Sequence, residues 1–303
     1  MEDIAFVIPC FNEQESIGLV IAEIQCLFSD ARIFVCDNHS LDQTAQVALQ
    51  AGAIVLHERV RGKGNAVRHL LRDVDADFVV MVDGDNTYDL STLPEAIERC
   101  RADRIDLMTG DRFAPTGRSN FRRGHGFGNL LFTSFFRFVF GVQTHDVFSG
   151  LRIFSRRLVK TFPLVSAEFE IEAELTIYAA RMRLPVADFP TRVKARINSE
   201  SKLSTVRDGL KILVFAFRLL HREFPLRLYW PISLVSASIA LVLFVIPYSE
   251  YLTTGLVTKI PTLVTSTIFV SISIMSFVSG LILKEISNLK YEQRYLHYRS
   301  IMK

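Results

Sequence analysis

Two carboxylates occupy a position in this chain where a metal ion or a phosphate group could be bound. Asp83, Gly84 and Asp85 directly follow the apolar run 78–82, which is typical of a strand buried on both faces in a parallel sheet. Ligands meet such sheets at the carboxyl ends of the strands, and a hard cation such as Mg²⁺ takes one or two carboxylates together with phosphate oxygens. Gly84 would leave room for the ligand beside the backbone. On these three residues alone, a metal site and an ordinary Asp-Gly turn are equally consistent with the sequence.

Three further segments could supply polar groups to the same edge of a sheet. Residues 9–13 follow the first apolar run, and Asp37 follows the second, where its carboxylate could accept hydrogen bonds from a base or a ribose. Residues 61–65 precede a helical pattern and offer backbone amides and Lys63 to a diphosphate. Because parallel strands end at one edge, we expect these segments to converge.

The elements that must position these residues alternate between strand and helix over the first 110 residues. Such a β-α-β rhythm predicts an α/β fold with a twisted, mainly parallel sheet, and residues 111–205 are expected to complete the same domain. The predicted strands cover 4–9, 32–36, 53–56, 78–82 and 105–109, and the predicted helices cover 15–28, 42–51, 64–74 and 91–102.

The C-terminal third is far more apolar than an ordinary soluble domain. The whole chain is 49% hydrophobic, and neither 228–249 nor 260–283 contains a charged residue. Each run is long enough to cross a bilayer, so we predict two transmembrane helices at about 228–248 and 262–283. A buried hairpin of a large soluble protein is the alternative.

Basic residues surround these two runs. Arginines precede the first run, and the tail 284–303 carries further lysines and arginines, so the positive-inside rule places the domain 1–205 and both termini in the cytoplasm. Residues 206–227 form an amphipathic pattern with one basic side. This segment is expected to lie in the membrane interface, or else to pack on the domain as an ordinary helix.

Composition argues against several other classes of protein. The four cysteines show no paired spacing, which suits reduced thiols rather than a disulfide framework or a zinc site. A net charge of +3 without interleaved aromatic and basic residues gives no reason to expect a nucleic-acid partner. No basic segment with a cleavage site opens the chain, so no secretory signal is expected.

Several ordered motifs resemble those of the family 2 glycosyltransferases with a GT-A fold. The resemblance is to the polyprenyl-phosphate sugar transferases in particular, such as dolichol-phosphate mannose synthase and bacterial undecaprenyl-phosphate transferases. It extends from residue 4 to about residue 205. The motifs that carry it are 8–13, 37–44, 62–64, 83–85, 109–113, 146–152 and 201–203.

The resemblance implies a role for each matching residue on the donor side. The nucleotide sugar, UDP- or GDP-linked, would bind in the half 1–110, with Mg²⁺ or Mn²⁺ held against its diphosphate by Asp83 and Asp85. One departure concerns the second loop, where the family usually has Asp-Asp-Gly-Ser and this chain has Asp37-Asn38-His39-Ser40. The donor-binding residues implied by the resemblance are Pro9, Phe11, Glu13, Asp37, Lys63 and Asp83.

The acceptor would bind in the half 111–205. A polyprenyl phosphate is anionic at pH 7, so it needs no strong general base but does need arginines, which pair with phosphate in a bidentate way. Direct attack on the anomeric carbon would invert its configuration. We expect Asp85, Arg112 and Arg152 to act in catalysis, and the acceptor phosphate to contact Arg112, Arg123, Arg152, Arg196 and Lys202.

Some residues and some functions stay open. Glu170 and Glu172 could orient the sugar or belong to a solvated acidic stripe, and His145 has no metal-ligand spacing that would give it a role. A family 2 enzyme with another acceptor, such as a polysaccharide synthase, is the main alternative function, although the Gln-x-x-Arg-Trp motif is missing. A non-catalytic membrane scaffold is a second alternative. The family resemblance also allows a homo-oligomer formed through the helix hairpins.

Overall fold

The computed structural model describes residues 3–114, 125–163, 170–194 and 205–301, with only the backbone given for 125–132 and 205–213. The first nine elements agree with the predicted ones to within about two residues at each end, because each follows from a local pattern. They are β1 (Ile4–Cys10), α1 (Ile17–Leu27), β2 (Arg32–Asp37), α2 (Thr44–Gln50), β3 (Ile54–His57), α3 (Lys63–Asp73), β4 (Phe78–Met81), α4 (Leu93–Ala102) and β5 (Leu107–Asp111).

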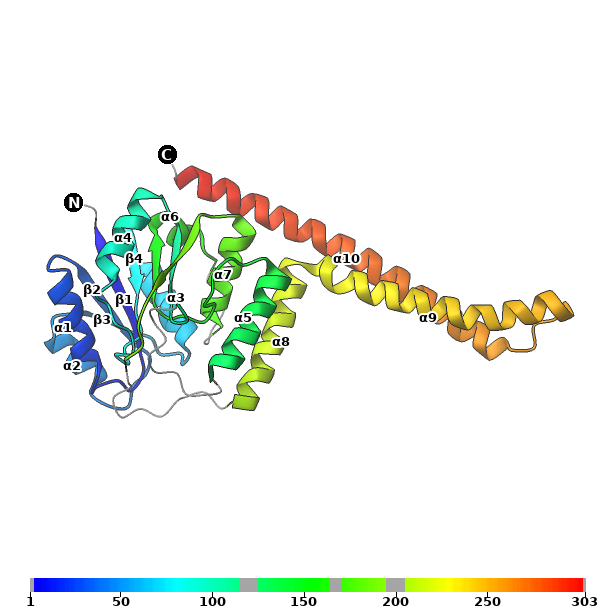
Figure 1. The fold of residues 1–303 in the computed structure, drawn as a ribbon, viewed down its shortest axis with the longest axis horizontal. Helices are drawn as coiled ribbons and strands as arrows, with labels where there is room; N and C mark the ends of the chain where they lie inside the picture. The colour runs from blue at the N-terminus through cyan, green and yellow to red at the C-terminus, as the bar shows by residue number, and fades with distance from the viewer. Residues whose placement is uncertain (1–2, 115–124, 164–169, 195–204, 302–303) are drawn as a thin grey trace. The chain divides into compact units, whose positions relative to one another are not determined.

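The remaining elements complete the domain and then form three long helices (Figure 1). They are α5 (His125–Phe140), β6 (Arg152–Ser155), α6 (Arg156–Thr161), α7 (Ile171–Met182), β7 (Val186–Pro190), α8 (Thr205–Glu223), α9 (Pro225–Thr254) and α10 (Ile260–Ile301).

One mainly parallel sheet organises the domain. Its strand order is β3-β2-β1-β4-β6-β5-β7. All neighbouring strands run parallel except β6, which pairs antiparallel with β4 and with β5. The predicted α/β class is therefore confirmed, and the carboxyl ends of β2, β1 and β4 lie next to each other at one edge.

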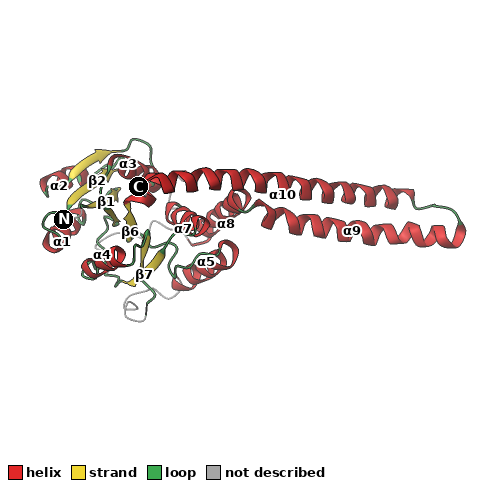
Figure 2. Cartoon of the chain, turned by 90° about the horizontal axis from the view of Figure 1, so that it is seen from above, coloured by secondary structure: helices red, strands yellow, loops and turns green. Residues whose placement is uncertain are grey.

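Helices cover both faces of the sheet, which explains why its strands are so apolar. Figure 2 shows α1 and α4 on one face and α3 and α7 on the other. All four residues of β4 are buried. On the first face Ile21 of α1 and Ile97 of α4 pack with Val80 of β4 in the main hydrophobic core. Burial on both faces is the condition under which a strand reads as a continuous apolar run.

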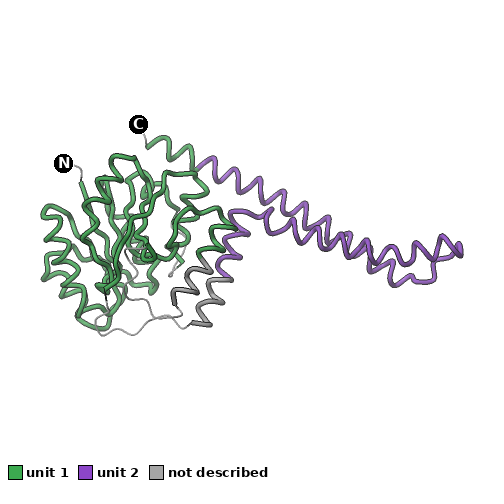
Figure 3. The backbone as a smooth tube through the Cα atoms, viewed as in Figure 1, with its two compact units in different colours: residues 1–210, 294–303 green, residues 211–293 purple. Residues whose placement is uncertain are grey.

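The chain divides into two compact units (Figure 3). Residues 1–210 and 294–303 form the first, and residues 211–293 form the second. In the second unit α9 and α10 contain apolar windows with mean hydropathy of 2.1 and 2.0, so by length and composition both could cross a membrane. Hydrogen bonds between them hold a hairpin, with Ser233 Oγ donating to the carbonyl of Ser273 (3.0 Å).

The last turns of α10, from residue 294 in the predicted basic tail 284–303, belong to the first unit. Tyr298 Oη donates to Asp106 Oδ2 (2.7 Å), and Asp106 is fully buried. The same carboxylate accepts hydrogen bonds from the Ser155 hydroxyl and from the Arg157 guanidinium. The C-terminal segment thus completes a buried polar group of the domain.

Candidate active site

The predicted convergence of loops occurs at the carboxyl edge of the sheet. Cys10, the last residue of β1, is paired in register with Asp37 at the end of β2. The backbone N–H of Val82 donates to the carbonyl of Val7 (3.1 Å), which extends the pairing of β1 with β4 up to Asp83. The loops that begin at residues 11, 38 and 83 therefore leave three neighbouring strands side by side.

Lys63 is the centre of the site. Its ammonium group lies 2.6 Å from Asp83 Oδ1 and 2.6 Å from Glu172 Oε1. Burial lowers the pKa of Lys63, but Asp83 and Glu172 raise it more, so the pKa lies above its ordinary value and the side chain stays charged. The first turn of α3 and the first turn of α7 are thereby joined to the end of β4.

Glu172 is a site residue whose role the sequence left open. Its side chain is only 4% exposed, and its second oxygen, Oε2, accepts no hydrogen bond from the described residues. It therefore does not belong to a solvated acidic stripe. Helical periodicity in the sequence does not reveal the contact of Glu172, because its partner Lys63 lies on a helix more than 100 residues away in the chain.

Asp83 and Asp85 form the predicted pair of carboxylates, although the metal role assigned to them stays a prediction. Asp83 keeps a quarter of its side chain exposed, while Asp85 Oδ1 accepts hydrogen bonds from the hydroxyl (2.6 Å) and N–H (3.2 Å) of Thr87. Two carboxylates fit Mg²⁺ or Mn²⁺ when water or substrate phosphate supplies the other oxygens.

Two glycines let protein side chains pack close to the backbone at this edge of the sheet. A Cβ atom at Gly84 would collide with the Glu13 carboxylate and lie 2.6 Å from Cys10 Sγ. The space that a side chain at residue 84 would need is therefore filled by protein atoms, while the expected approach of a ligand to this backbone stays a prediction. A Cβ at Gly150 would collide with the Asp83 carboxylate, so this glycine is what lets residues 149–150 pack against the acid.

The predicted base and ribose residues gather beside β1 and β2. The Asp37 side chain is mostly buried, and its Oδ1 accepts no hydrogen bond from the described residues, so it offers an acceptor to a ligand. The Arg61 guanidinium lies over the Phe11 ring, 5.0 Å from its centroid. Pro9 is buried within β1, and Glu13 is half-buried.

Asn38, where the family usually has aspartate, holds the loop that carries Lys63. Its amide nitrogen donates to the carbonyls of Val60 (2.8 Å) and Glu58 (3.3 Å), and its oxygen accepts from the N–H of Gly62 (2.7 Å). An aspartate could not make the first two hydrogen bonds, because an ionised carboxylate only accepts. Asparagine at position 38, in place of the family's usual aspartate, therefore stabilises the loop before α3.

The two arginines expected to bind an acceptor phosphate are both paired with protein groups. Arg112 makes a bidentate contact with Asp146, which is fully buried (2.6 and 2.9 Å). The Arg112 side chain keeps 22% of its surface exposed. Burial lowers the pKa of Arg112, but electrostatic interactions with Tyr88 and Asp146 raise it by more, so this pKa lies above its ordinary value.

Arg152 is in a different position, because it is completely buried. Its guanidinium donates to the carbonyls of Ser149 and Val147 and to the Thr176 hydroxyl, and burial lowers its pKa. In this conformation Arg152 has no surface to offer, so the structure gives no support for a contact with phosphate. The other predicted acceptor residues, Arg123, Arg196 and Lys202, lie outside the described residues.

A second group of polar side chains lies near Arg112 but further along the sheet. Asp111, His145 and Asp188 each bring one ligand atom to within 4.8 Å of the others. Burial raises the pKa of Asp111, and Asp188 and Asp146 raise it further. No sequence pattern marks this group, since its members come from β5, β7 and the segment between α5 and β6.

The fold and this edge define the class of protein as a GT-A-like glycosyltransferase, in which a mainly parallel sheet gathers acids and cations where its strands end. The sequence profile of the family described as Glycosyl transferase family 2 matches residues 5–162. The chain therefore belongs to family 2 of the glycosyltransferases, and the predicted family and enzyme class are confirmed.

Similar proteins agree with this assignment. Glycosyltransferase AglJ of Haloferax volcanii is 30% identical over 243 residues, which cover 78% of each chain. A dolichyl-phosphate hexose transferase of the same organism is 30% identical over 211 residues, covering 70% of this chain and 91% of that protein. The crystal structure of Mycobacterium tuberculosis glucosyl-3-phosphoglycerate synthase with Mn²⁺, UDP-glucose and phosphoglyceric acid superposes with a TM-score of 0.53. It is 25% identical, covering 66% of this chain and 73% of the synthase.

Proposed function

We propose that this enzyme transfers a single hexose from UDP- or GDP-sugar to a polyprenyl phosphate at the cytoplasmic face of the membrane, with inversion at the anomeric carbon. The observation that carries the proposal is that one chain joins a family 2 transferase domain to two helices able to cross a membrane. An acceptor with a long lipid tail suits an enzyme that is itself held in the membrane. The similarity to a dolichyl-phosphate hexose transferase supports the same acceptor class.

On the donor side, the nucleotide would bind over Phe11 and Asp37, and its diphosphate would lie toward Asp83. A divalent cation on Asp83 and Asp85 would stabilise the negative charge that develops on the departing nucleoside diphosphate. Lys63 is already charged and fixed between Asp83 and Glu172, so it adds positive charge there without reorganising. In this proposal Glu172 holds Lys63 rather than acting as a base.

On the acceptor side, a phosphate monoester is already an anionic nucleophile and needs orientation more than deprotonation. Arg112 remains the candidate contact, because part of its side chain is exposed and Asp146 fixes its direction. Arg152 would act indirectly, by holding the backbone of residues 147–149 next to Gly150 and Asp83. Arg123, Arg196 and Lys202 stay proposed phosphate contacts.

The membrane arrangement is also part of the proposal. Basic residues before and after the apolar helices favour a cytoplasmic domain and cytoplasmic termini in the inner membrane. The helix α8, with its basic and apolar sides in the sequence, would lie in the interface and bring the domain to the phosphate group of the lipid.

The decisive experiment incubates detergent-purified protein with undecaprenyl phosphate, Mg²⁺ or Mn²⁺, and a panel of UDP- and GDP-sugars, and detects products by mass spectrometry. We expect one donor to give a lipid phosphate carrying one sugar. Asp85→Asn should reduce the rate at least about 100-fold, because it removes the negative charge of a proposed metal ligand. Asp103→Asn, an exposed acid at the end of α4, should leave the rate unchanged.

Other results would contradict specific parts of the proposal. Sugar transfer to a different acceptor, or formation of a polymer, would refute the polyprenyl phosphate acceptor. Full activity of Asp85→Asn, or activity unaffected by a chelator, would refute the metal site at Asp83 and Asp85. An α-linked product from an α-linked donor would refute inversion.

A further inference from the structure

The group formed by Asp111, His145 and Asp188 contains none of the residues proposed to contact the donor or the acceptor. Asp111 ends β5, and Asp188 lies in the parallel neighbour β7, where it is paired in register with Thr109. Because side chains alternate along a strand, Asp111 projects from the same face of β5 as Thr109. His145 reaches this face from the segment that precedes β6, and the three ligand atoms lie within 4.8 Å of one another.

The spacing within the group suits a bound cation. His145 Nδ1 lies 2.8 Å from Asp188 Oδ2, a hydrogen bond that a cation bound by both groups would replace. Two ligand atoms at right angles around a divalent ion, each bonded at roughly 2.1 Å, are about 3 Å apart. The Asp188 carboxylate is also oriented from outside, because it accepts hydrogen bonds from the Thr144 hydroxyl (2.7 Å) and the His145 N–H (2.7 Å). Such outer contacts commonly fix the direction of metal ligands.

Asp111 brings a second carboxylate to the group. The residue is nine-tenths buried, and its Oδ1 accepts a hydrogen bond from the N–H of Phe113 (2.8 Å). Its other oxygen accepts no hydrogen bond from the described residues, and among these residues the cationic side chain that pairs with Asp188 is His145. Two carboxylates this close together repel each other, and a cation between them removes that repulsion.

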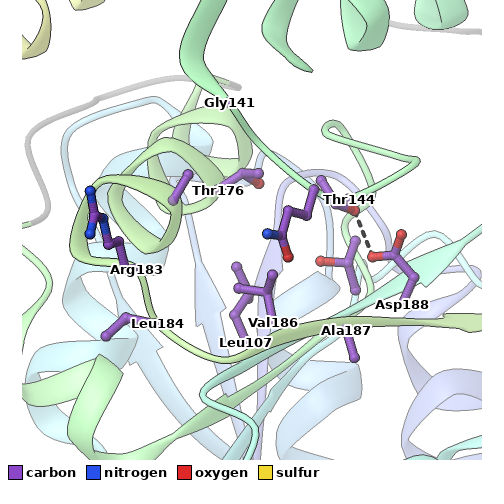
Figure 4. A pocket seen from close by; sticks show the side chains of 12 residues that line it. Leu107, Gly141, Thr144, Thr176, Arg183, Leu184, Val186, Ala187 and Asp188 are labelled. Atoms are coloured by element: carbon purple, nitrogen blue, oxygen red, sulfur yellow. Dashed lines mark hydrogen bonds between the residues drawn. The ribbon is translucent and has the colours of Figure 1, made fainter. Parts of the chain in front are cut away.

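The group also borders a cavity. Asp188 lines a pocket of about 410 Å³ together with the polar side chains of Thr109, Gln143 and Thr144. Figure 4 shows Asp188 hydrogen-bonded to Thr144 on one side of this pocket and Arg183 on the other. The pocket gives water or another oxygen ligand access to Asp188, so a cation there could complete its coordination.

From these observations we infer that Asp111, His145 and Asp188 bind one divalent cation, of a kind that accepts both imidazole and carboxylate ligands, such as Mn²⁺ or Zn²⁺. The site shares no ligand with Asp83 and Asp85. Its occupant would tie the end of β5, the middle of β7 and the segment before β6 to one another, and so brace the part of the domain that carries Arg112 and Asp146.

The test is a titration of the full-length, detergent-purified protein with Mn²⁺ alone, in which bound ions are counted by electron paramagnetic resonance. We expect the wild type to bind two ions, of which His145→Ala loses one and Asp85→Asn loses the other. Affinity at the new site should fall at least about tenfold in His145→Ala. His297→Ala replaces an exposed histidine near the C-terminus and should bind as the wild type does.

A second variant and a second readout protect the test against misfolding. Asp111→Asn is nearly isosteric and should also lose one ion. Mn²⁺ should raise the Tm of Asp85→Asn but raise the Tm of an Asp85→Asn/His145→Ala double variant by much less.

Two other results of the titration would decide between the sites. If both His145→Ala and Asp111→Asn bind as much Mn²⁺ as the wild type, the inferred site does not exist. If the wild type binds one ion, lost in His145→Ala and kept in Asp85→Asn, the inferred site is supported and the metal role of Asp83 and Asp85 fails.

Discussion

Replacing Lys63 by methionine tests the central claim about the site, that one lysine holds two carboxylates. Methionine keeps most of the aliphatic length and removes the charge. The Lys63 side chain is 13% exposed and that of Glu172 is 4% exposed, so water screens their contact little. Removing one partner of a buried pair costs about 3–5 kcal/mol. We expect a value near the lower limit, about 3 kcal/mol, because the second partner, Asp83, is a quarter exposed.

A loss of this size is easily measured by thermal unfolding followed by circular dichroism in detergent. For a domain of roughly 200 residues, each kcal/mol lowers Tm by about 2–4 °C, so Lys63→Met should unfold about 6–12 °C earlier. The pKa of Lys63 is raised, so its ion pair is present below the ordinary lysine pKa and is lost only above it. The difference in Tm should therefore stay constant from pH 7 to pH 9.

A double-mutant cycle with Glu172→Gln separates the contact from a general loss of packing. If Lys63 holds Glu172, the double variant should be more stable than the sum of the two single effects by at least about 1 kcal/mol. Effects that add to within about 0.5 kcal/mol would refute the pairing. As a matched control, Arg72→Met removes a cation from the exposed pair with Asp73 and should leave Tm unchanged.

Two further predictions concern the rest of the first unit. Tyr298→Phe removes a hydrogen-bond donor from the buried carboxylate of Asp106 and should lower the free energy of unfolding by about 1–3 kcal/mol, measured as a lower Tm. The control, Tyr251→Phe on an exposed part of α9, should leave Tm unchanged. Equal Tm values for the two variants would contradict the stabilising role of the end of α10. A thiol reagent at pH 8 should label only Cys26 in the native protein and all four cysteines after denaturation, as counted by intact mass. The other three cysteines are buried, and burial raises the pKa of Cys36 and Cys100 to about 12. Labelling of a second thiol in the native protein would contradict that burial.

The sequence predicted those parts of the fold that local patterns determine. The apolar run that became β4 and the acids after it were found because burial on both faces leaves a continuous hydrophobic signal. The pairing of Lys63 with Glu172 could not be found in this way, since it depends on how α3 and α7 pack on the sheet. Arg152 shows the same limit, because its position in a motif suggested a phosphate contact and its burial followed from neighbours that no local pattern names.

The return of α10 to the first unit has a practical consequence for handling this enzyme. The catalytic unit is discontinuous in the chain, because residues 294–303 join it after the whole apolar hairpin has intervened. A soluble fragment that stops at residue 210 would lack Tyr298 and leave the Asp106 carboxylate short of one donor. The catalytic unit therefore cannot be excised intact with a single cut. Replacing the hairpin 211–293 by a flexible linker would keep both of its segments, and an affinity tag at the C-terminus would follow Tyr298 by only a few residues.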